Sequence, residues 1–597
     1  MEYNSANPDD IPLSANARKV LEGRYLLKDE QGRIVESPRA MFQRVAKAVA
    51  EADLLYDHGA KGKQLEDEFF HLMINLDFLP NSPTLMNAGT EIGQLSACFV
   101  LPVGDSIREI FGAVQNMALI HQSGGGTGFS FSRLRPKDDV VKSTGGIASG
   151  PLSFMRVFDE STEIIKQGGR RRGANMGILR VDHPDIVDFI RAKERGGFLT
   201  NFNISVNATD RFMESVKADG RYDLINPRTG KVTKTLRAKQ VFDRAVKSAW
   251  KTGDPGFIFI DEINRYNPTP ELGEIESTNP CGEQPLLPYE SCNLGSINLS
   301  TMVRDGIIDW EKLKRTVHLG IHFLDNIIDV NKFPLPEIES ITKGNRKIGL
   351  GVMGFAEMLI KLGISYASDE ALEVAERVME FIHREAREKS IDLARKRGSF
   401  PNFRGSLWEK KGFERMRNAT LTTVAPTGTI SIIAGTSSGI EPLFAISFYR
   451  EILEGTKLLE VNPHFRSMAE TEGLASQELM ERIALKGSIQ NFPSVPETLR
   501  RIFLTALDIP FDWHIKMQAV FQKYTDNAVS KTINLPREAT REDVANAYLM
   551  AYERKCKGIT IFRYGSKQHQ VLYIGLSKGM PLQATSEFSG DCRICSV

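Results

Sequence analysis

Short apolar runs alternate with longer amphipathic stretches along most of this chain of 597 residues. Residues 97–101, 177–181, 257–260 and 421–425 have the length and composition of buried strands. Between Ser368, a helix-capping residue, and Gly398, a helix-stopping residue, apolar side chains recur at helical spacing. Strands that alternate with helices in this way predict an α/β architecture.

The two ends of the chain differ from this middle part. Ser37-Pro38 joins a capping hydroxyl to a proline that suits the first helical position, and a second helix is expected over 64–76. After about Tyr573 the apolar pattern fades into polar residues. We therefore expect a mainly helical region at 1–80, an α/β unit at 81–570 and a flexible tail at 571–597.

Charge and composition exclude several classes of function. The formal net charge of +1 gives no overall attraction to nucleic acid or to an anionic membrane. No apolar run approaches the length of a membrane span, and the amino terminus lacks a signal-peptide pattern. Six cysteines in a chain this long argue against a secreted disulfide framework, so we expect a cytoplasmic protein.

The segment Asn279-Pro280-Cys281-Gly282-Glu283 carries the strongest chemical signal. Proline and glycine on either side of the cysteine favour a tight loop, which can place one side chain in a cavity. An amide can orient hydroxyl groups and a carboxylate can accept a proton, so the thiol is suited to act on a polar, hydroxylated substrate. Taken alone, the segment also fits a turn with a buried cysteine.

Three other segments each allow two interpretations. The pair Cys592 and Cys595 fits a redox dithiol on a mobile arm better than half of a zinc site, because no second ligand pair lies nearby in the sequence. The loop 426–431 follows an apolar run and fits either an anion-binding helix start or a plain turn. The basic loop 167–173 fits either phosphate binding or solvent exposure. Cys556, between charged residues, is expected to be inert or exposed.

Together these segments resemble the catalytic chain of ribonucleotide reductase, most closely the adenosylcobalamin-dependent class II form. The resemblance covers roughly residues 82–566 and the terminal dithiol. The motifs that carry it, in the family's order, are Asn81-Ser82-Pro83-Thr84, Ser96-Ala97-Cys98, Gly104-Asp105-Ser106, the glycine run 124–128, the loop 168–175, the segment 279–283, Ser291-Cys292-Asn293-Leu294-Gly295, the loop 426–431 and Gly439-Ile440-Glu441-Pro442.

The resemblance implies a role for five of the six cysteines. Cys281 would form the thiyl radical that removes the ribose 3′ hydrogen, Glu283 would take the 3′-hydroxyl proton, and Asn279 would orient the substrate hydroxyls. Cys98 and Cys292 would be the dithiol that reduces the 2′ position and ends as a disulfide. Cys592 and Cys595 would re-reduce that disulfide and would in turn be reset by a thioredoxin-like partner.

The resemblance also implies two nucleotide sites and no metal ligand set. Substrate contacts would come from Ser82, Ala97, Cys98, Gly126, Asn279, Pro280, Cys281, Gly282, Glu283, Pro426, Thr427, Gly428, Thr429, Ile430 and Ser431. A deoxynucleotide or ATP effector would bind within about 100–180, at Asp105, Ser106, Ile107, Arg135, Lys142, Gln167, Arg170 and Arg171. The family forms homodimers, so we expect a dimer with this effector site at its interface.

The implied fold is a ten-stranded α/β barrel of two half-barrels with Cys281 on a central finger loop. Class II is favoured over metal-dependent class I because no Tyr-Tyr pair precedes Arg563-Tyr564-Gly565-Ser566, and because the front of the chain is short for the class I ATP-cone. No DxHxxG cobalamin motif occurs, so the cobalt-contacting residues stay unassigned. Reduction of ribonucleoside di- or triphosphates with adenosylcobalamin is the expected activity.

Two alternatives remain open at the level of the sequence. One is a class I-like large chain that needs a separate metal-containing radical subunit. The other, from a different class, is a non-catalytic nucleotide-sensing or zinc-binding interaction protein, supported by the basic loop and the CxxC pair.

Overall fold

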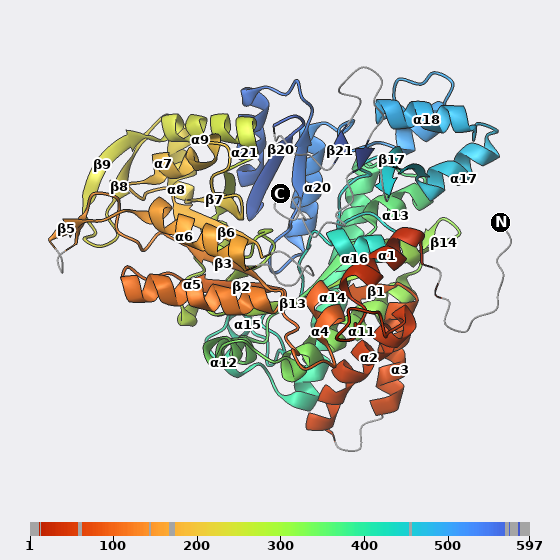
Figure 1. Cartoon of the computed structure of the whole chain (residues 1–597), viewed down its shortest axis with the longest axis horizontal. Helices are drawn as coiled ribbons and strands as arrows, with labels where there is room; N and C mark the ends of the chain where they lie inside the picture. Colours follow the sequence, from red (N-terminus) through yellow and green to blue (C-terminus); the bar gives the residue numbers. More distant parts are fainter. Residues whose placement is uncertain are drawn as a thin grey trace.

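A ten-stranded mixed sheet forms the centre of the molecule (Figure 1). The computed structural model describes residues 11, 13–57, 62–141, 145–165, 173–452, 456–566, 572–573 and 583–584. The strand order is β1-β13-β2-β3-β6-β7-β10-β20-β19, and β16 pairs with β13. The strands are β1 (Phe78–Pro80), β2 (Cys98–Pro102), β3 (Gly126–Ser130), β6 (Asn175–Arg180), β7 (Phe202–Ala208), β10 (Gly256–Phe259), β13 (Ser291–Asn298), β16 (Ile348–Met353), β19 (Thr532–Leu535) and β20 (Gly558–Arg563).

Successive strands β2, β3, β6, β7 and β10 are all parallel, which requires a crossover connection between each pair. The helices that pack around the sheet are α5 (Ile107–Gln122), α6 (Pro151–Ile164), α8 (Asp210–Lys217), α9 (Ala238–Thr252), α11 (Trp310–Val330), α12 (Pro336–Asn345), α13 (Phe355–Leu362), α14 (Asp369–Arg397), α16 (Gly428–Ala434), α20 (Phe511–Lys523) and α21 (Arg541–Glu553). The expected helix between Ser368 and Gly398 is confirmed as α14, with the Ser368 hydroxyl accepting from the Ala371 N–H.

The segment 421–425 was expected to be a strand, and this prediction is only partly right. Its backbone makes single parallel bridges, from Thr422 to Leu350 on β16 and from Val424 to Val529 just before β19. Each bridge is one residue long because successive residues bond to different neighbours: Thr423 N–H donates to Leu350 and Val424 N–H to Ala528. The segment thereby connects the two ends of the sheet and closes it into a barrel.

The N-terminal helices, red in Figure 1, are α1 (Ala15–Arg24), α2 (Pro38–Ala50), α3 (Gly62–Ile74) and α4 (Ser82–Asn87). Helix α1 packs against α16, α2 and α3 pack against α11, and α4 packs against α2. The predicted cap at Ser37 is confirmed, since its hydroxyl accepts from the Ala40 N–H. The helix expected over 64–76 starts and ends two residues earlier, as α3. None of the helices in the described ranges combines the length and apolar character needed to cross a bilayer.

Two large apolar cores lie on either side of the barrel. One joins the N-terminal helices to β16, α11 and α14, and the other joins β2, β3, β6, β7 and β10 to α5, α9 and α21. Between them a small hairpin, β11 (Ser277–Thr278) and β12 (Pro285–Leu286), packs against β2, β3 and β6. The tip of this hairpin is the segment 279–284, which we call the finger loop.

The remaining elements are peripheral. They are α7 (Ile186–Ile190), α10 (Ile260–Arg265), α15 (Leu407–Lys410), α17 (Pro463–Thr471), α18 (Gln477–Lys486), α19 (Glu497–Ile502), β4 (Val140–Val141), β5 (Gly146–Ile147), β8 (Arg221–Ile225), β9 (Val232–Arg237), β14 (Val303–Arg304), β15 (Ile307–Ile308), β17 (Ser447–Ile452), β18 (Thr456–Val461), β21 (Leu572–Tyr573) and β22 (Gln583–Ala584), with short 3₁₀ turns η1 (Glu51–Leu55), η2 (Ala192–Glu194), η3 (Pro270–Leu272), η4 (Leu299–Met302) and η5 (Pro401–Phe403).

Candidate active site

The finger loop is held in one shape by its own hydrogen bonds. The Asn279 side-chain oxygen accepts from the Gln284 N–H at 3.0 Å, and the Gly282 N–H donates to the Asn279 carbonyl at 3.1 Å. Gly282 has a φ of 82°, a left-handed conformation that glycine adopts without steric cost. The turn therefore depends on Asn279 and Gly282 together, and it leaves Cys281 half-buried at the tip.

Two glycines of β3 make room for this loop inside the barrel. A Cβ at Gly128 would lie 1.7 Å from the Thr278 carbonyl oxygen, and one at Gly126 would lie 3.1 Å from Cγ of Pro280. The glycine run in the sequence thus serves a close approach of backbone to backbone. Gly126 lies against the finger loop.

Cys98 and Cys292 lie directly opposite each other on adjacent antiparallel strands, β2 and β13. Both are buried, and no disulfide joins them. Residues opposite each other in such a pair have Cα atoms about 4.5–5.5 Å apart, which falls within the range that a disulfide bridges. The Asn279 amide donates to the Cys98 sulfur at 3.2 Å, so the finger loop contacts this dithiol.

The environment of Cys292 favours its protonated thiol. Burial raises the pKa of Cys292 well above its usual range, the nearby Lys347 ammonium lowers it, and Glu290 and Glu283 raise it. Lys347 and Glu290 form an ion pair at 2.6 Å with both side chains 1% exposed. Lys347 also touches the cysteine directly, since the Cys292 thiol donates to the Lys347 carbonyl at 3.7 Å. The sequence reasoning missed this pair, although two charges beside apolar strands were a visible signal.

Glu283 is buried at the far side of the loop tip, with a 2% exposed side chain. Its backbone carbonyl accepts from the Ala528 N–H at 2.9 Å and from the Thr423 hydroxyl at 3.0 Å. These bonds tie the finger loop to the segments that close the barrel. Asn279, Cys281 and Glu283 are therefore held on a single short turn in the barrel interior.

A cavity that opens to solvent lies against the finger loop. Cys281 is part of its wall, together with polar residues from β7, α20 and the ends of β19 and β20. The lining includes Asn203, Ser205, Asp254, Gln518, Ser530, Lys531, Thr532 and Thr560. The sequence did not single out any of these residues, because they come from distant parts of the chain and form no motif.

The predicted phosphate-binding segment 426–431 and the predicted substrate contact Ser82 both lie at helix starts. Thr427, with a φ of 55°, precedes α16, and within the described residues no side chain caps this helix start. Ser82 is the first residue of α4, and its hydroxyl lies 2.7 Å from the Tyr25 hydroxyl. Helix starts present N–H groups and a partial positive charge, which suit an anionic ligand. Ala97 is bonded instead to β3, since its carbonyl accepts from the Gly126 N–H.

The predicted effector residues that the structure describes gather at the start of α5. Asp105 pairs with Arg135 at 2.8 Å, and the Ser106 hydroxyl caps α5 by accepting from the Glu109 N–H. Ile107 is 63% exposed. Lys142, Gln167, Arg170 and Arg171 lie outside the described residues, as do the tail cysteines Cys592 and Cys595.

Cys556 was expected to be inert or exposed, and of these two alternatives exposure is wrong. Its side chain is 0% exposed, and burial raises its pKa to about 12. Of its charged neighbours, Arg554 and Lys555 are exposed, whereas the Lys557 ammonium is buried and donates to the Asp526 and Asn527 carbonyls at 2.6 Å.

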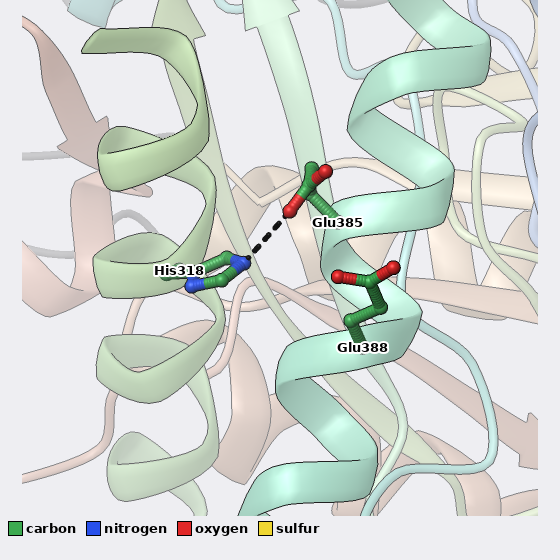
Figure 2. A group of neighbouring side chains, drawn as sticks. All are labelled: His318, Glu385 and Glu388. Carbon is green, nitrogen blue, oxygen red and sulfur yellow. Dashed lines mark hydrogen bonds and ion pairs between the residues drawn. The ribbon is translucent and has the colours of Figure 1, made fainter. Parts of the chain in front are cut away.

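Figure 2 shows the group of potential metal ligands found among the described residues, His318 on α11 with Glu385 and Glu388 on α14. Glu385 already accepts from His318 at 3.1 Å and pairs with Lys314 at 3.3 Å and Arg384 at 3.2 Å. Cations this close oppose a bound metal ion, so the group fits an ion-pair network between two helices.

The amino-acid sequence was compared with family models and with known proteins. Residues 96–562 match the family model "Ribonucleotide reductase, barrel domain", and residues 12–93 match "Ribonucleotide reductase, all-alpha domain". The chain is 53% identical to a protein of Thermoplasma acidophilum named "Vitamin B12-dependent ribonucleoside-diphosphate reductase", over 96% of this chain and 81% of the relative. It is 50% identical to a Mycobacterium tuberculosis protein of the same name, over 98% and 84%.

More distant relatives include a "Ribonucleoside-diphosphate reductase subunit alpha" of Chlamydia pneumoniae, 28% identical over 88% of this chain and 57% of that protein. Among solved structures, the class Id ribonucleotide reductase alpha subunit of Actinobacillus ureae superposes with a TM-score of 0.77, covering 94% of this chain and 99% of that one. At 24% identity this likeness shows the fold alone.

Proposed function

This chain belongs to the ribonucleotide reductase large-chain family, and we propose that it reduces ribonucleoside diphosphates to deoxyribonucleotides with adenosylcobalamin as its radical source. The observation that carries the proposal is the position of Cys281, on a buried loop whose Asn279 contacts the Cys98–Cys292 pair. The preference for diphosphates and for vitamin B12 comes from the names of the two relatives that share half or more of their residues with this chain.

Cys281, Glu283 and Asn279 of the finger loop each have a separate role in the first steps of the reaction. The Cys281 sulfur, as a radical, takes the 3′ hydrogen of the ribose, and the Glu283 carboxylate accepts the 3′-hydroxyl proton. Asn279 holds the hydroxyls in place through its amide. The barrel interior excludes water from these steps, which protects a reactive radical from side reactions.

Cys98 and Cys292 then act as the reductant. The 2′-hydroxyl leaves as water, the two thiols give up their hydrogens, and the two sulfurs join in a disulfide. The 3′ hydrogen returns from Cys281, so the loop thiol ends the cycle as a radical again. Direct opposition of the two cysteines across β2 and β13 supports this role, because a disulfide can form there with little movement of the backbone.

The residues around Cys281 fit a bound cofactor. The cavity whose wall contains Cys281 is lined by polar side chains, among them Asn203, Ser205, Gln518, Ser530 and Thr560, which can bind the polar groups of a cofactor. Adenosylcobalamin, when bound, supplies homolytic cleavage of its cobalt–carbon bond. The chain's contribution is to hold the cofactor beside the thiol and to shield both from solvent.

A second copy of the chain is the proposed partner at the effector site. Ile107, Phe111 and Leu119 are exposed along α5, and Ile164 is exposed at the end of α6. Exposed apolar side chains are typical of interaction surfaces, and Ile107 follows Asp105 of the Asp105–Arg135 pair by two residues. A homodimer formed here would place a deoxynucleotide or ATP effector at the interface.

The cysteine pair at 592 and 595 is the proposed arm that re-reduces the Cys98–Cys292 disulfide, with a thioredoxin-like protein as its own reductant. This exchange suits the reducing cytoplasm, where we place the protein.

The decisive experiment is an anaerobic assay of the purified chain, without any second protein, using the four ribonucleotides as diphosphates and triphosphates. We expect deoxynucleotide formation that requires adenosylcobalamin and prefers diphosphates. Cys281→Ser should bind substrate and form no product. Turnover that requires a separate subunit and does not require adenosylcobalamin would support the class I alternative. Zinc bound stoichiometrically by an inactive chain would support the interaction-protein alternative.

A further inference from the structure

A buried ion pair lies beside Cys292, and no step of the proposed reaction uses it. The side chains of Lys347 and Glu290 are each 1% exposed, and their charged groups lie 2.6 Å apart. Burying two charges costs free energy that their mutual attraction does not always offset, so stability alone is a weak reason for such a pair. What the pair can do depends on its position relative to the cysteine.

Strand register places Lys347 next to Cys292. Asn293 on β13 pairs with Ile348 at the start of β16, so Cys292 and Lys347 each lie one residue before a paired position. The Cys292 thiol donates to the Lys347 carbonyl at 3.7 Å. Burial raises the pKa of Cys292, and of the charged groups around it the Lys347 ammonium has the largest effect, which is to lower that pKa. Lys347 therefore contacts the cysteine through its backbone and acts on it through its charge.

Glu290 keeps the ammonium of Lys347 in this position. The Glu290 carboxylate also accepts from the Leu287 N–H at 2.6 Å and from the Asn345 amide. The Glu290 carbonyl accepts from the Val100 N–H at 3.2 Å, which ties this residue to the strand that carries Cys98. Because both its carboxylate and its backbone are bonded, Glu290 holds the ammonium in the protein interior.

The backbone that carries Lys347 is fixed as well. Arg346, directly before it, has a φ of 47°, a left-handed conformation that is uncommon for residues other than glycine. The buried Arg346 guanidinium pairs with Asp325 at 2.9 Å and with Asp329 at 2.8 Å, which holds this turn at the end of α12. The position of Lys347 is thus set on one side by these ion pairs and on the other by the register of β16.

We propose that Lys347 stabilises Cys292 as a thiolate while the Cys98–Cys292 disulfide is being reduced. This inference rests on the proposed function, because it takes the two cysteines to be the reductant of the nucleotide. A thiolate of the reducing dithiol attacks Cys98, which is 4% exposed against 0% for Cys292. The bond between the two cysteine sulfurs breaks, and Cys292 leaves as a thiolate. The second thiolate of the dithiol then releases Cys98, the dithiol ends as a disulfide, and Cys98 and Cys292 take up the two protons that the dithiol lost.

The charge of Lys347 should affect the rate of this reaction and not its equilibrium. Burial disfavours a thiolate, and a thiol of higher pKa leaves a disulfide more slowly. A cation beside Cys292 lowers this barrier. The disulfide at the start and the two thiols at the end carry no charge, so the same cation has little effect on the equilibrium between them.

The test measures how fast dithiothreitol reduces the Cys98–Cys292 disulfide in the full chain that carries Cys592→Ser and Cys595→Ser. The disulfide is formed with diamide, and free Cys98 and Cys292 are counted by alkylation and mass spectrometry after acid quenching. We expect Lys347→Met to slow the reduction by about fivefold or more, and to leave the equilibrium with dithiothreitol unchanged.

The matching variant of the partner residue separates charge from structure. Glu290→Gln breaks the same ion pair, but Glu290 raises the pKa of Cys292, so this variant should not slow the reduction. A purely structural role predicts the same direction of change in both variants, because each makes the disulfide more accessible. Arg44 and Glu36 form another ion pair, at 2.7 Å, with side chains 13% and 7% exposed. Arg44→Met is therefore the control for a general loss of stability and should leave the rate unchanged.

Lys347→Met combined with Glu290→Gln keeps the test decisive if a single variant fails to fold, which thermal melting will show. The double variant should also slow the reduction, because Lys347 has the larger effect on Cys292. A smaller effect of Lys347→Met than the one expected, equal slowing by Glu290→Gln, or no disulfide after diamide would each overturn the inference. The reductase proposal stands after any of these results if cofactor-dependent turnover is observed, whereas absence of that turnover in the unaltered chain overturns the proposed function itself.

Discussion

Replacing Gly128 with alanine should displace the finger loop from its strand. An ideal Cβ at this position would lie 1.7 Å from the Thr278 carbonyl oxygen, whereas real Cβ contacts are essentially never closer than 3.0 Å. The two groups must therefore separate by about 1.3 Å, from 1.7 to 3.0 Å. Both belong to the backbone, so no side-chain rotation relieves the clash. Because a misplacement of about 1 Å can reduce a rate about a hundredfold, turnover should fall by at least that factor.

Two further glycines provide a graded series for this prediction. A Cβ at Gly126 would lie 3.1 Å from Cγ of Pro280, and a small shift of either group can relieve this contact. Gly126→Ala should therefore lower turnover less than Gly128→Ala does. A Cβ at Gly23 would meet nothing within 4 Å, so Gly23→Ala should leave turnover unchanged. Turnover is measured as deoxynucleotide formed per folded chain, and folding is checked by thermal melting. If Gly128→Ala turned over as fast as Gly23→Ala, Cys281 would not depend on the seating of the loop, and the reasoning would be refuted.

Three other perturbations test separate parts of the structure. Lys347→Met leaves the Glu290 carboxylate buried without its cation and should lower the free energy of unfolding by about 3–5 kcal/mol in denaturant titrations. Adding Glu290→Gln should recover most of this loss. Equal stabilities of the single and double variants would argue against a stabilising ion pair. Burial raises the pKa of Cys556 from 9.0 to about 12, so the folded chain keeps a proton that the unfolded chain loses, and the free energy of unfolding should decrease as the pH rises above about 9. Cys556→Ala should flatten that dependence, and an unchanged slope would contradict the assignment. Cys592→Ser combined with Cys595→Ser should keep turnover with a small dithiol and lose it with thioredoxin; full activity with thioredoxin would remove the proposed arm.

Local features of this protein could be predicted from the sequence because they depend on a few neighbouring residues. The hydroxyl of Ser368 and the left-handed Gly398 delimit α14 as expected, and Pro280 and Gly282 make the finger loop turn wherever it is placed. The family resemblance added the barrel and the ten strands, which the structure contains. The roles of the individual site residues remain predictions.

Contacts between distant segments were decided by the tertiary structure alone. The opposition of Cys98 and Cys292 arises from the register of β2 against β13, and the approach of Gly128 to Thr278 arises from the hairpin entering the barrel. Cys556 is buried in spite of its charged neighbours, because the ends of several elements meet around it. Hydrogen bonds and φ angles act over a few residues, so they can be read from the sequence. Which surfaces meet depends instead on how the whole barrel closes, and the cavity lined by Cys281 and the other residues around it exists only after that closure.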